Sequence, residues 1–317
     1  MATHTPPVLF SSTDGDVGYP FIYAEQEIRA EIADMLDVLQ IGVIPLVGDL
    51  AGAGSDTVRV TRIGGVGWQL PFATMASEVA AITPSGFRTG FDVVTIARHG
   101  LAMQESYTNQ ILSREAAVLL EDLKARIPAS WMKTFRQKVA AAGAGFTGAV
   151  GTTGTAWTFD DELALVATFH ETEGFAGEAI TMRHPEQYSD LRQSIRVEPN
   201  FQFPEITQAL QGLSPAGGAV DFLGFRNFAT FDITDSAGDH QGFAMAPGAI
   251  GWAVASTLGV KVEDPDRALF VPEFGLVCEQ KTDGNVATGQ WDANAYFGVA
   301  TADPSVAPQT RIISIND

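Results

Sequence analysis

The chain has very little cysteine: Cys278 is the single one among 317 residues. One thiol cannot form an intrachain disulfide, which excludes the disulfide-stapled folds of small secreted domains and fits a protein made in a reducing cytoplasm. Cys278 lies in the strand-like run Phe274–Glu279. We therefore expect a buried, inert thiol there and not a nucleophile.

Charge is scarce too, and positive charge above all. Charged residues make up 18% of the chain, and 19 Lys and Arg face 38 Asp and Glu, which gives a formal net charge of −19. A dedicated nucleic-acid binder would present a basic face, so this balance excludes that class but allows a protein that encloses DNA without gripping it. With 45% hydrophobic residues and a mean hydropathy of +0.08, we expect a large core or a surface buried by partners.

Long hydrophobic runs are absent. The longest uncharged stretch, 139–159, is rich in Gly and Thr and predicts a loop, not a transmembrane helix. Residues 1–10 have neither the basic start nor the apolar core of a signal peptide. We expect no membrane segment and no targeting signal.

Motifs that carry chemistry are also missing. No two of the histidines lie close enough in sequence for a local metal motif; they are His4, His99, His170, His184 and His240. The stretch Gly143–Gly148 matches the dinucleotide fingerprint by letter, but it follows a predicted helix and is interpreted as a linker. No Gly-x-Ser-x-Gly elbow occurs. We predict no catalytic residue, no cofactor and no metal, and hence no enzyme.

Helical periodicity is present in three places. Apolar residues from Ala24 onward fall on one stripe and predict an amphipathic helix that ends before Gly42. A longer helix is predicted from Ser113 to about Ala142, with Pro128 expected to kink or divide it. The sequence Thr158–Asp161 resembles a capping box and predicts a helix to about His170.

Two β-rich runs indicate a long hairpin. Thr57–Ile63 alternates with period two, and Phe91–Ala97 is again rich in β-formers. The tip between them, 64–90, carries Trp68 and Phe72 and is too long and too aromatic for an ordinary turn, so we expect a functional loop. An α/β region then extends to about residue 262, and the rest is β-rich.

This order of elements resembles the Hong Kong 97 phage-type capsid fold over nearly the whole chain. Four stretches carry the resemblance: Phe91–Met103 as the returning leg of the extended loop, Thr181–Leu191 as a strand-to-helix joint, Phe222–Phe228 as the short strand after it, and Trp291–Val299 as a strand near the C-terminus. The resemblance implies an α+β fold in six segments: an N-terminal arm (1–23), a first peripheral part (24–56), an extended β-hairpin loop (57–97), a peripheral domain with a long spine helix (98–157), an axial domain (158–262) and a peripheral C-terminal β segment (263–317).

The resemblance also implies a function. A chain of this kind would be the major capsid protein of a tailed phage, which self-assembles into hexamers and pentamers and forms the icosahedral head around double-stranded DNA without reading its sequence. The residues expected to contact neighbouring subunits are Arg59, Arg62, Trp68, Phe72 and Arg88. Two alternatives stay open: an encapsulin-type compartment shell with the same fold, and, from another class, an α/β hydrolase without a recognisable motif.

Further partners follow from the same resemblance. Only about twenty residues precede the first predicted helix, which favours a separate scaffolding protein over a cleaved scaffolding segment. A portal and a decoration protein are the other expected partners. The expected location is the virion, after assembly in the host bacterial cytoplasm.

Overall fold

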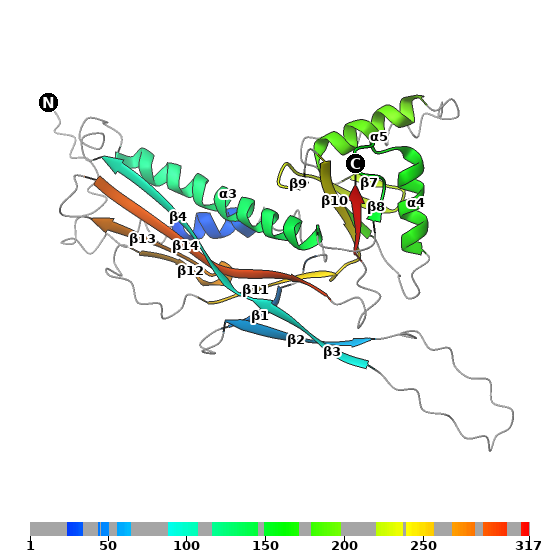
Figure 1. Cartoon of the computed structure of the whole chain (residues 1–317). Coiled ribbons are helices and arrows are strands. Elements are labelled where there is room, and N and C mark those ends of the chain that lie inside the picture. The colour runs from blue at the N-terminus through cyan, green and yellow to red at the C-terminus, as the bar shows by residue number, and fades with distance from the viewer. Residues whose placement is uncertain are drawn as a thin grey trace, which may run out of the picture.

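Two sheets, joined by one long helix, organise the chain in this computed structural model (Figure 1). The structure describes residues 24–33, 44, 46–50, 56–64, 88–106, 116–144, 149–170, 179–197, 220–236, 239–256, 268–282, 288–302 and 312–316. Within these ranges, no helix has the length and apolar character needed to cross a bilayer. The fold is a mixture of helices with mainly antiparallel strands.

The first sheet is built around the longest strand, β14. Its order is β1-β11-β14-β13-β12, with β4 also paired to β14. The six strands are β1 (Leu46–Asp49), β4 (Ala97–Ser106), β11 (Ile250–Val254), β12 (Ala268–Val271), β13 (Leu276–Thr282) and β14 (Thr288–Thr301). A short 3₁₀ turn, η2 (Pro272–Phe274), joins β12 to β13. Ten residue pairs connect β14 to β4, from Thr288↔Ser106 to Phe297↔Ala97, so β4 is firmly attached to this sheet.

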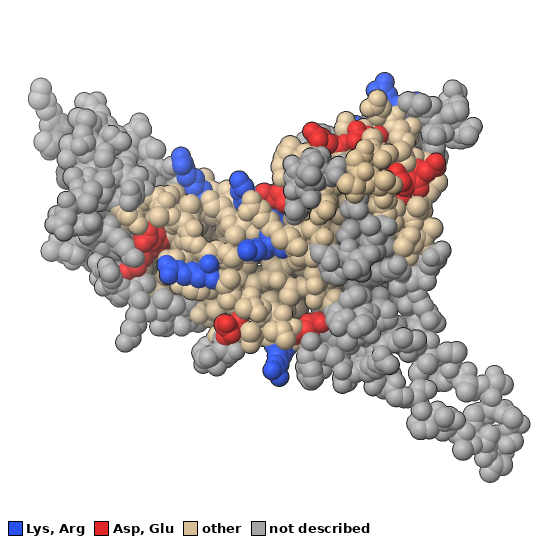
Figure 2. All heavy atoms as spheres, viewed as in Figure 1, with Lys and Arg blue, Asp and Glu red and all other residues tan. Residues whose placement is uncertain are grey.

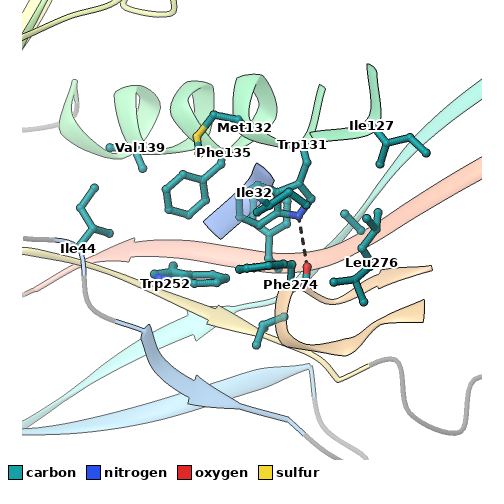
Figure 3. Close-up of a cluster of buried hydrophobic side chains, with 14 of the residues drawn as sticks. Ile32, Ile44, Ile127, Trp131, Met132, Phe135, Val139, Trp252, Phe274 and Leu276 are labelled. Atoms are coloured by element: carbon teal, nitrogen blue, oxygen red, sulfur yellow. Dashed lines mark hydrogen bonds between the residues drawn. The ribbon is translucent and has the colours of Figure 1, made fainter. Parts of the chain in front are cut away.

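The helix α3 (Ala116–Gly143) covers one face of the first sheet. Its buried side chains include Ile127, Trp131 and Phe135, at the four-residue spacing that the sequence predicts. The Trp131 ring lies 5.2–6.0 Å, centre to centre, from four other rings, those of Phe135, Trp252, Phe274 and Phe297. The Trp131 indole Nε1 donates a hydrogen bond to the Phe274 carbonyl oxygen at 3.2 Å (Figure 3). An aromatic cluster therefore fixes the helix on the sheet.

The second sheet has the order β5-β15-β10-β6-β8-β7, with β9 paired to β10. Its strands are β5 (Ala149–Val150), β6 (Ala179–Arg183), β7 (Val220–Phe222), β8 (Phe225–Ala229), β9 (Thr234–Ser236), β10 (Asp239–Met245) and β15 (Ile312–Asn316). Alternation along β10 sends Phe243 and Met245 into the core under α3 and Ala244 into a second core. The second core is formed with α4 (Phe159–His170) and α5 (Pro185–Val197).

The C-terminal end of α3 connects the two sheets. At Gly143, its last residue, an added Cβ would lie 2.3 Å from the Phe243 ring of β10. The helix therefore meets the second sheet so closely that only glycine fits. Gly143 is also the first residue of the fingerprint-like stretch 143–148. In the structure it ends α3 and packs against β10, and 145–148 lies outside the described residues.

Several sequence predictions can be compared with these elements. The capping box is confirmed: the Thr158 backbone N–H donates to Asp161 Oδ2 at 3.0 Å, and the Asp161 N–H donates to Thr158 Oγ1 at 3.3 Å. The first helix is present over 24–33, and 34–41 lies outside the described residues. Pro128 does not divide α3, which continues as one helix from Ala116 to Gly143. Cys278 is fully buried, and burial raises the pKa of its thiol to about 12.

The sheets cross two of the boundaries that the sequence suggests. β11 lies in the segment 158–262 but pairs with β1 and β14 of the first sheet. β15 lies in the segment 263–317 but pairs with β5 and β10 of the second sheet. The chain thus passes between the sheets more often than a division into consecutive segments allows, because strands far apart in sequence pair with each other.

Candidate assembly surface

The hairpin predicted from the sequence is a two-stranded ribbon of β2 (Thr57–Gly64) and β3 (Arg88–Thr95). The strands pair antiparallel without interruption, from Thr57↔Thr95 to Gly64↔Arg88. In Figure 1 the ribbon lies on the side of the first sheet away from α3 and extends outward. Since the ribbon forms a sheet of two strands in the described part of the chain, each strand has an outer edge whose backbone groups can pair with another chain.

Two glycines bring the root of the ribbon close to the first sheet. An added Cβ at Gly298 of β14 would lie 2.1 Å from the Thr95 carbonyl oxygen, and one at Gly48 of β1 would lie 2.5 Å from Val58 Cγ1. A hydrogen bond of 2.8 Å from the Ile96 backbone N–H to the Asp56 carbonyl closes the root. The ribbon can therefore cross the sheet only because both positions lack a side chain.

This crossing corrects one boundary. The sequence assigns the returning leg to Phe91–Ala97, whereas β3 ends at Thr95 and Ala97 already begins β4. The stretch Phe91–Met103 is thus two strands, one in the ribbon and one in the first sheet. The change of direction occurs at Ile96, opposite Gly298, and nothing in the local sequence marks it.

The ribbon has one buried and one exposed face. Val94 and Asp92 are buried, at 2% and 8% exposure, whereas Val93 between them is 48% exposed. The cross-strand partner of Val93 is Arg59, whose side chain is also exposed. Arg59 and Val93 therefore share the outward face of the ribbon.

The five predicted contact residues have different positions. Arg59 is exposed near the middle of β2. Arg62 and Arg88 belong to the outer half of the ribbon, where they pair with Gly90 and Gly64. Trp68 and Phe72 lie outside the described residues. The structure thus brings the three arginines onto one ribbon. It does not describe the two aromatic residues, and the role of all five as intersubunit contacts stays a prediction.

A buried polar network, not predicted from the sequence, stabilises the second core. The Arg183 guanidinium forms an ion pair with the Glu162 carboxylate at 2.7 Å, and both side chains are 0% exposed. Trp157 Nε1 donates to the same carboxylate at 2.9 Å, and the guanidinium lies over the Trp157 and Tyr188 rings. Burial alone would lower the pKa of Arg183, but Glu162 raises it, so the guanidinium stays charged.

A second part of this network involves neutral groups. The Tyr188 hydroxyl donates to the Phe228 carbonyl at 3.3 Å, and it also lies 3.3 Å from Thr181 Oγ1 and 3.3 Å from Asn227 Oδ1. Burial raises the pKa of Tyr188 to about 12, although the charge of Arg183 opposes the shift. The network joins α4, α5, β6 and β8, so it fixes α4 and α5 on the second sheet. These two helices and the second sheet form the second lobe, and α3 with the first sheet forms the first lobe.

A hollow between α3 and the first sheet is one place where an active site could lie. Its lining is mostly apolar, and among the described residues that line it His99 is the one titratable side chain. Burial and the charge of Lys138 lower the pKa of His99, and a backbone hydrogen bond with Phe297 partly offsets them. A histidine without a neighbouring acid or base in the lining gives no support to a hydrolase.

Two lobes, a helix packed across the longer sheet and a projecting ribbon make up a mixed α+β fold. Solved shell structures with the Hong Kong 97-type fold match it over most of the chain, which confirms the resemblance inferred from the sequence. The solved structures that match include shells of three kinds. The mature capsid of bacteriophage PhiM1 matches with a TM-score of 0.53 at 10% identity, covering 87% of this chain and 85% of that one. An encapsulin complex from Synechococcus elongatus matches with a TM-score of 0.53 at 11% identity over 86% and 84%. The capsid of an empty GTA particle matches with a TM-score of 0.53 at 12% identity over 89% of each chain.

No protein-family model matches the sequence, and no curated protein does. The fold is therefore recognised through three-dimensional structure, at an identity where likeness establishes the fold and not the particular role.

Proposed function

We propose that this chain is the major capsid protein of a tailed double-stranded DNA phage. It would self-assemble into hexamers and pentamers that form an icosahedral head around the genome. The observation that carries the proposal is the fold, which this chain shares over most of its length with the phage capsid named above. The outer edges of the ribbon pair with no other strand among the described residues, and this supports a role in pairing with neighbours.

The charge of the chain supports the proposal that it encloses DNA without binding it tightly. The net charge is −19. On the face drawn in Figure 2, the described Lys and Arg side chains are scattered and form no continuous basic patch. A strongly negative subunit does not hold packaged DNA tightly, since like charges repel.

The proposal also assigns a role to each part of the subunit. The first sheet with α3 corresponds to a peripheral domain and its spine helix, the second sheet to an axial domain, and the ribbon to an extended loop over a neighbouring subunit. Each subunit would bury well over roughly 2,000 Å² against its neighbours, as obligate assemblies do. A scaffolding protein, a portal and a decoration protein would be its partners during assembly in the host cytoplasm.

Expression of the chain alone and with its neighbouring genes, followed by negative-stain microscopy, tests the proposal. We expect hollow, closed particles. A protein that stays monomeric under all these conditions and buries no such area in a cryo-EM map or crystal would contradict it.

The arginines of the ribbon test the proposed contact surface. The double variant Arg59→Glu with Arg62→Glu should remain a folded, soluble subunit and lose particle formation, because attraction to acidic neighbours becomes repulsion. The matched control, Lys133→Glu with Lys138→Glu, makes the same change of charge at two exposed positions of α3. Particles that form normally from the ribbon variant would refute the contact role.

An encapsulin-type shell is the second candidate, because a structure of that kind matches as well as the phage capsid does. Gene context separates the two. Terminase and portal genes nearby would support a phage head, whereas a neighbouring gene for a ferritin-like or peroxidase cargo would support a compartment.

A further inference from the structure

Two histidines far apart in sequence meet at the edge of the second lobe. His184 lies between β6 and α5, and His240 lies on β10. Their imidazole rings are stacked, with centres 3.6 Å apart and an angle of 22° between the planes. Glu186, in the first turn of α5, places a carboxylate oxygen 2.8 Å from His240 Nε2 and 4.0 Å from His184 Nδ1.

From this geometry we propose that His184, Glu186 and His240 form a binding site for a divalent transition-metal ion, with Zn²⁺ as the best fit. The three residues each offer one ligand atom, and these atoms all lie within 4.8 Å of one another. Two imidazole nitrogens and a carboxylate oxygen are a donor set that Zn²⁺ accepts, whereas Mg²⁺ and Ca²⁺ prefer oxygen ligands alone. The site is independent of the shell function proposed above.

The distances match the size of such an ion. Zinc bonds of about 2.0–2.1 Å in a tetrahedral site separate neighbouring ligand atoms by roughly 3.4 Å. The two distances to the Glu186 oxygen, 2.8 and 4.0 Å, lie on either side of that value. The His184 Nδ1 atom also accepts a hydrogen bond from the Glu186 backbone N–H at 3.3 Å, so metal binding requires this imidazole to turn its lone pair from the N–H toward the ion. The ion then replaces the proton that His240 and Glu186 share in their hydrogen bond.

The buried side chain of Gln187 holds the backbone at the two histidines in place. Gln187 is 0% exposed. Its Oε1 accepts a hydrogen bond from the His184 backbone N–H at 3.1 Å, and its Nε2 donates to the His240 carbonyl at 2.9 Å. An added Cβ at Gly242 would lie 2.8 Å from Gln187 Oε1, so the glycine leaves room for this bridge. A preorganised backbone lowers the cost of ordering the ligands.

The local sequence also fixes the third ligand. Pro185 is the first residue of α5, where its fixed φ favours the start of a helix. Glu186 then carries its charge in the first turn, where the helix dipole favours an anion. Its side chain is 73% exposed, while those of His184 and His240 are 13% and 15% exposed. An ion can therefore enter from solvent on the Glu186 side, and its remaining coordination positions stay open to water or to a ligand from another molecule.

The test uses the full chain, freed of metal with a chelator, and titrated with ZnCl₂ by isothermal calorimetry. We expect one Zn²⁺ per chain, and a rise in Tm of at least about 3 °C at saturation that a chelator reverses. MgCl₂ should not reproduce the rise. The variants His240→Asn and Glu186→Gln should each weaken zinc binding by at least about tenfold.

The matched control is His99→Gln, which removes an imidazole in the first lobe and should leave zinc binding unchanged. Glu186→Gln changes an exposed side chain by one atom and keeps the fold, so it decides the matter even where His240→Asn does not fold. Wild-type protein that takes up no stoichiometric zinc overturns the proposal. So does a loss of binding in His99→Gln equal to the loss in Glu186→Gln.

Discussion

The two lobes bury different kinds of side chain. Under α3, the core is apolar, with Trp131 at the centre of a group of aromatic rings. Between α4, α5 and the second sheet, the core surrounds the Arg183–Glu162 ion pair. The first arrangement gains free energy from apolar burial in proportion to area. The second must repay the desolvation of two charges with good geometry, which it does with several hydrogen bonds and two ring contacts.

This difference indicates different demands on the two lobes. Both cores fix their helices on a sheet, but the aromatic core does so mainly through close packing, whereas the ion pair does so through directed hydrogen bonds. We expect the network to give the second lobe, with its seven-stranded sheet and two helices, a unique packing at some cost in stability. The variants below, from the largest expected effect to the smallest, test this contrast.

Breaking the ion pair should have the largest effect. Arg183→Met leaves the Glu162 carboxylate buried without its cation, and we expect a loss of about 3–5 kcal/mol in the free energy of unfolding of the subunit. Adding Glu162→Gln should restore most of the loss. Denaturant unfolding followed by tryptophan fluorescence measures both. The control is Arg136→Met, which breaks an ion pair with Asp232 whose arginine is 39% exposed and should cost about 1 kcal/mol or less. Equal losses in the two Arg→Met variants would mean that burial of the pair does not matter.

In the aromatic core, a smaller loss is expected from Trp131→Phe. The change removes the donor to the buried Phe274 carbonyl and part of the ring contacts, at a cost of about 1–3 kcal/mol. Combined with Arg183→Met, the two losses should add to within about 0.5 kcal/mol, since the residues belong to separate clusters. A clear departure from additivity in denaturant unfolding would show that the two cores are coupled.

Alkaline pH should destabilise both lobes, through one group in each. Burial raises the pKa of Cys278 and that of Tyr188 to about 12, from ordinary values of 9.0 and 10.0. A raised pKa in the folded state gives stability that is complete below the ordinary pKa and is lost as pH rises toward 12. The expected loss is about 1.4 kcal/mol per group for each pH unit within its range. In Cys278→Ala the decline should begin near pH 10 and not near pH 9; an unchanged pH profile of unfolding would contradict this.

The sequence predicts local features of the fold better than it predicts either core. The capping box at Thr158 and the alternating legs of the ribbon depend on residues close together in the chain, so both could be predicted. Ile96, where β3 gives way to β4, is set by Gly298, about two hundred residues further along. The Arg183–Glu162 pair spans 21 residues, and the Glu186–His240 contact spans 54, so no local motif marks either.

The candidate site follows the same pattern. A long hairpin with three arginines could be predicted because period two and composition are local signals. The contrast between exposed Val93 and buried Val94 depends on which face of the ribbon meets Gly48 and β1. No local pattern predicts the proposed metal site, since its three residues come together only when β10 pairs with β6.

The smallest expected effect belongs to His99, at the edge of the aromatic core. Burial and the charge of Lys138 lower its pKa below the ordinary 6.5. Since the unfolded chain then binds the proton more strongly than the folded one, stability falls as pH drops below about 6.5 toward the lowered value. Because the imidazole is only partly buried, the loss should stay below about 1 kcal/mol. An NMR titration of the His99 ring gives the pKa directly. We expect a pKa of His99 below 6.5. This pKa should rise in Lys138→Gln, since a neighbouring positive charge is removed, and should not change in Lys133→Gln. A value unchanged by Lys138→Gln would leave burial as the one cause of the lowered pKa. A value above 6.5 would contradict the prediction, because a solvated ring titrates near 6.5 and a higher pKa requires a neighbouring negative charge or hydrogen-bond acceptor.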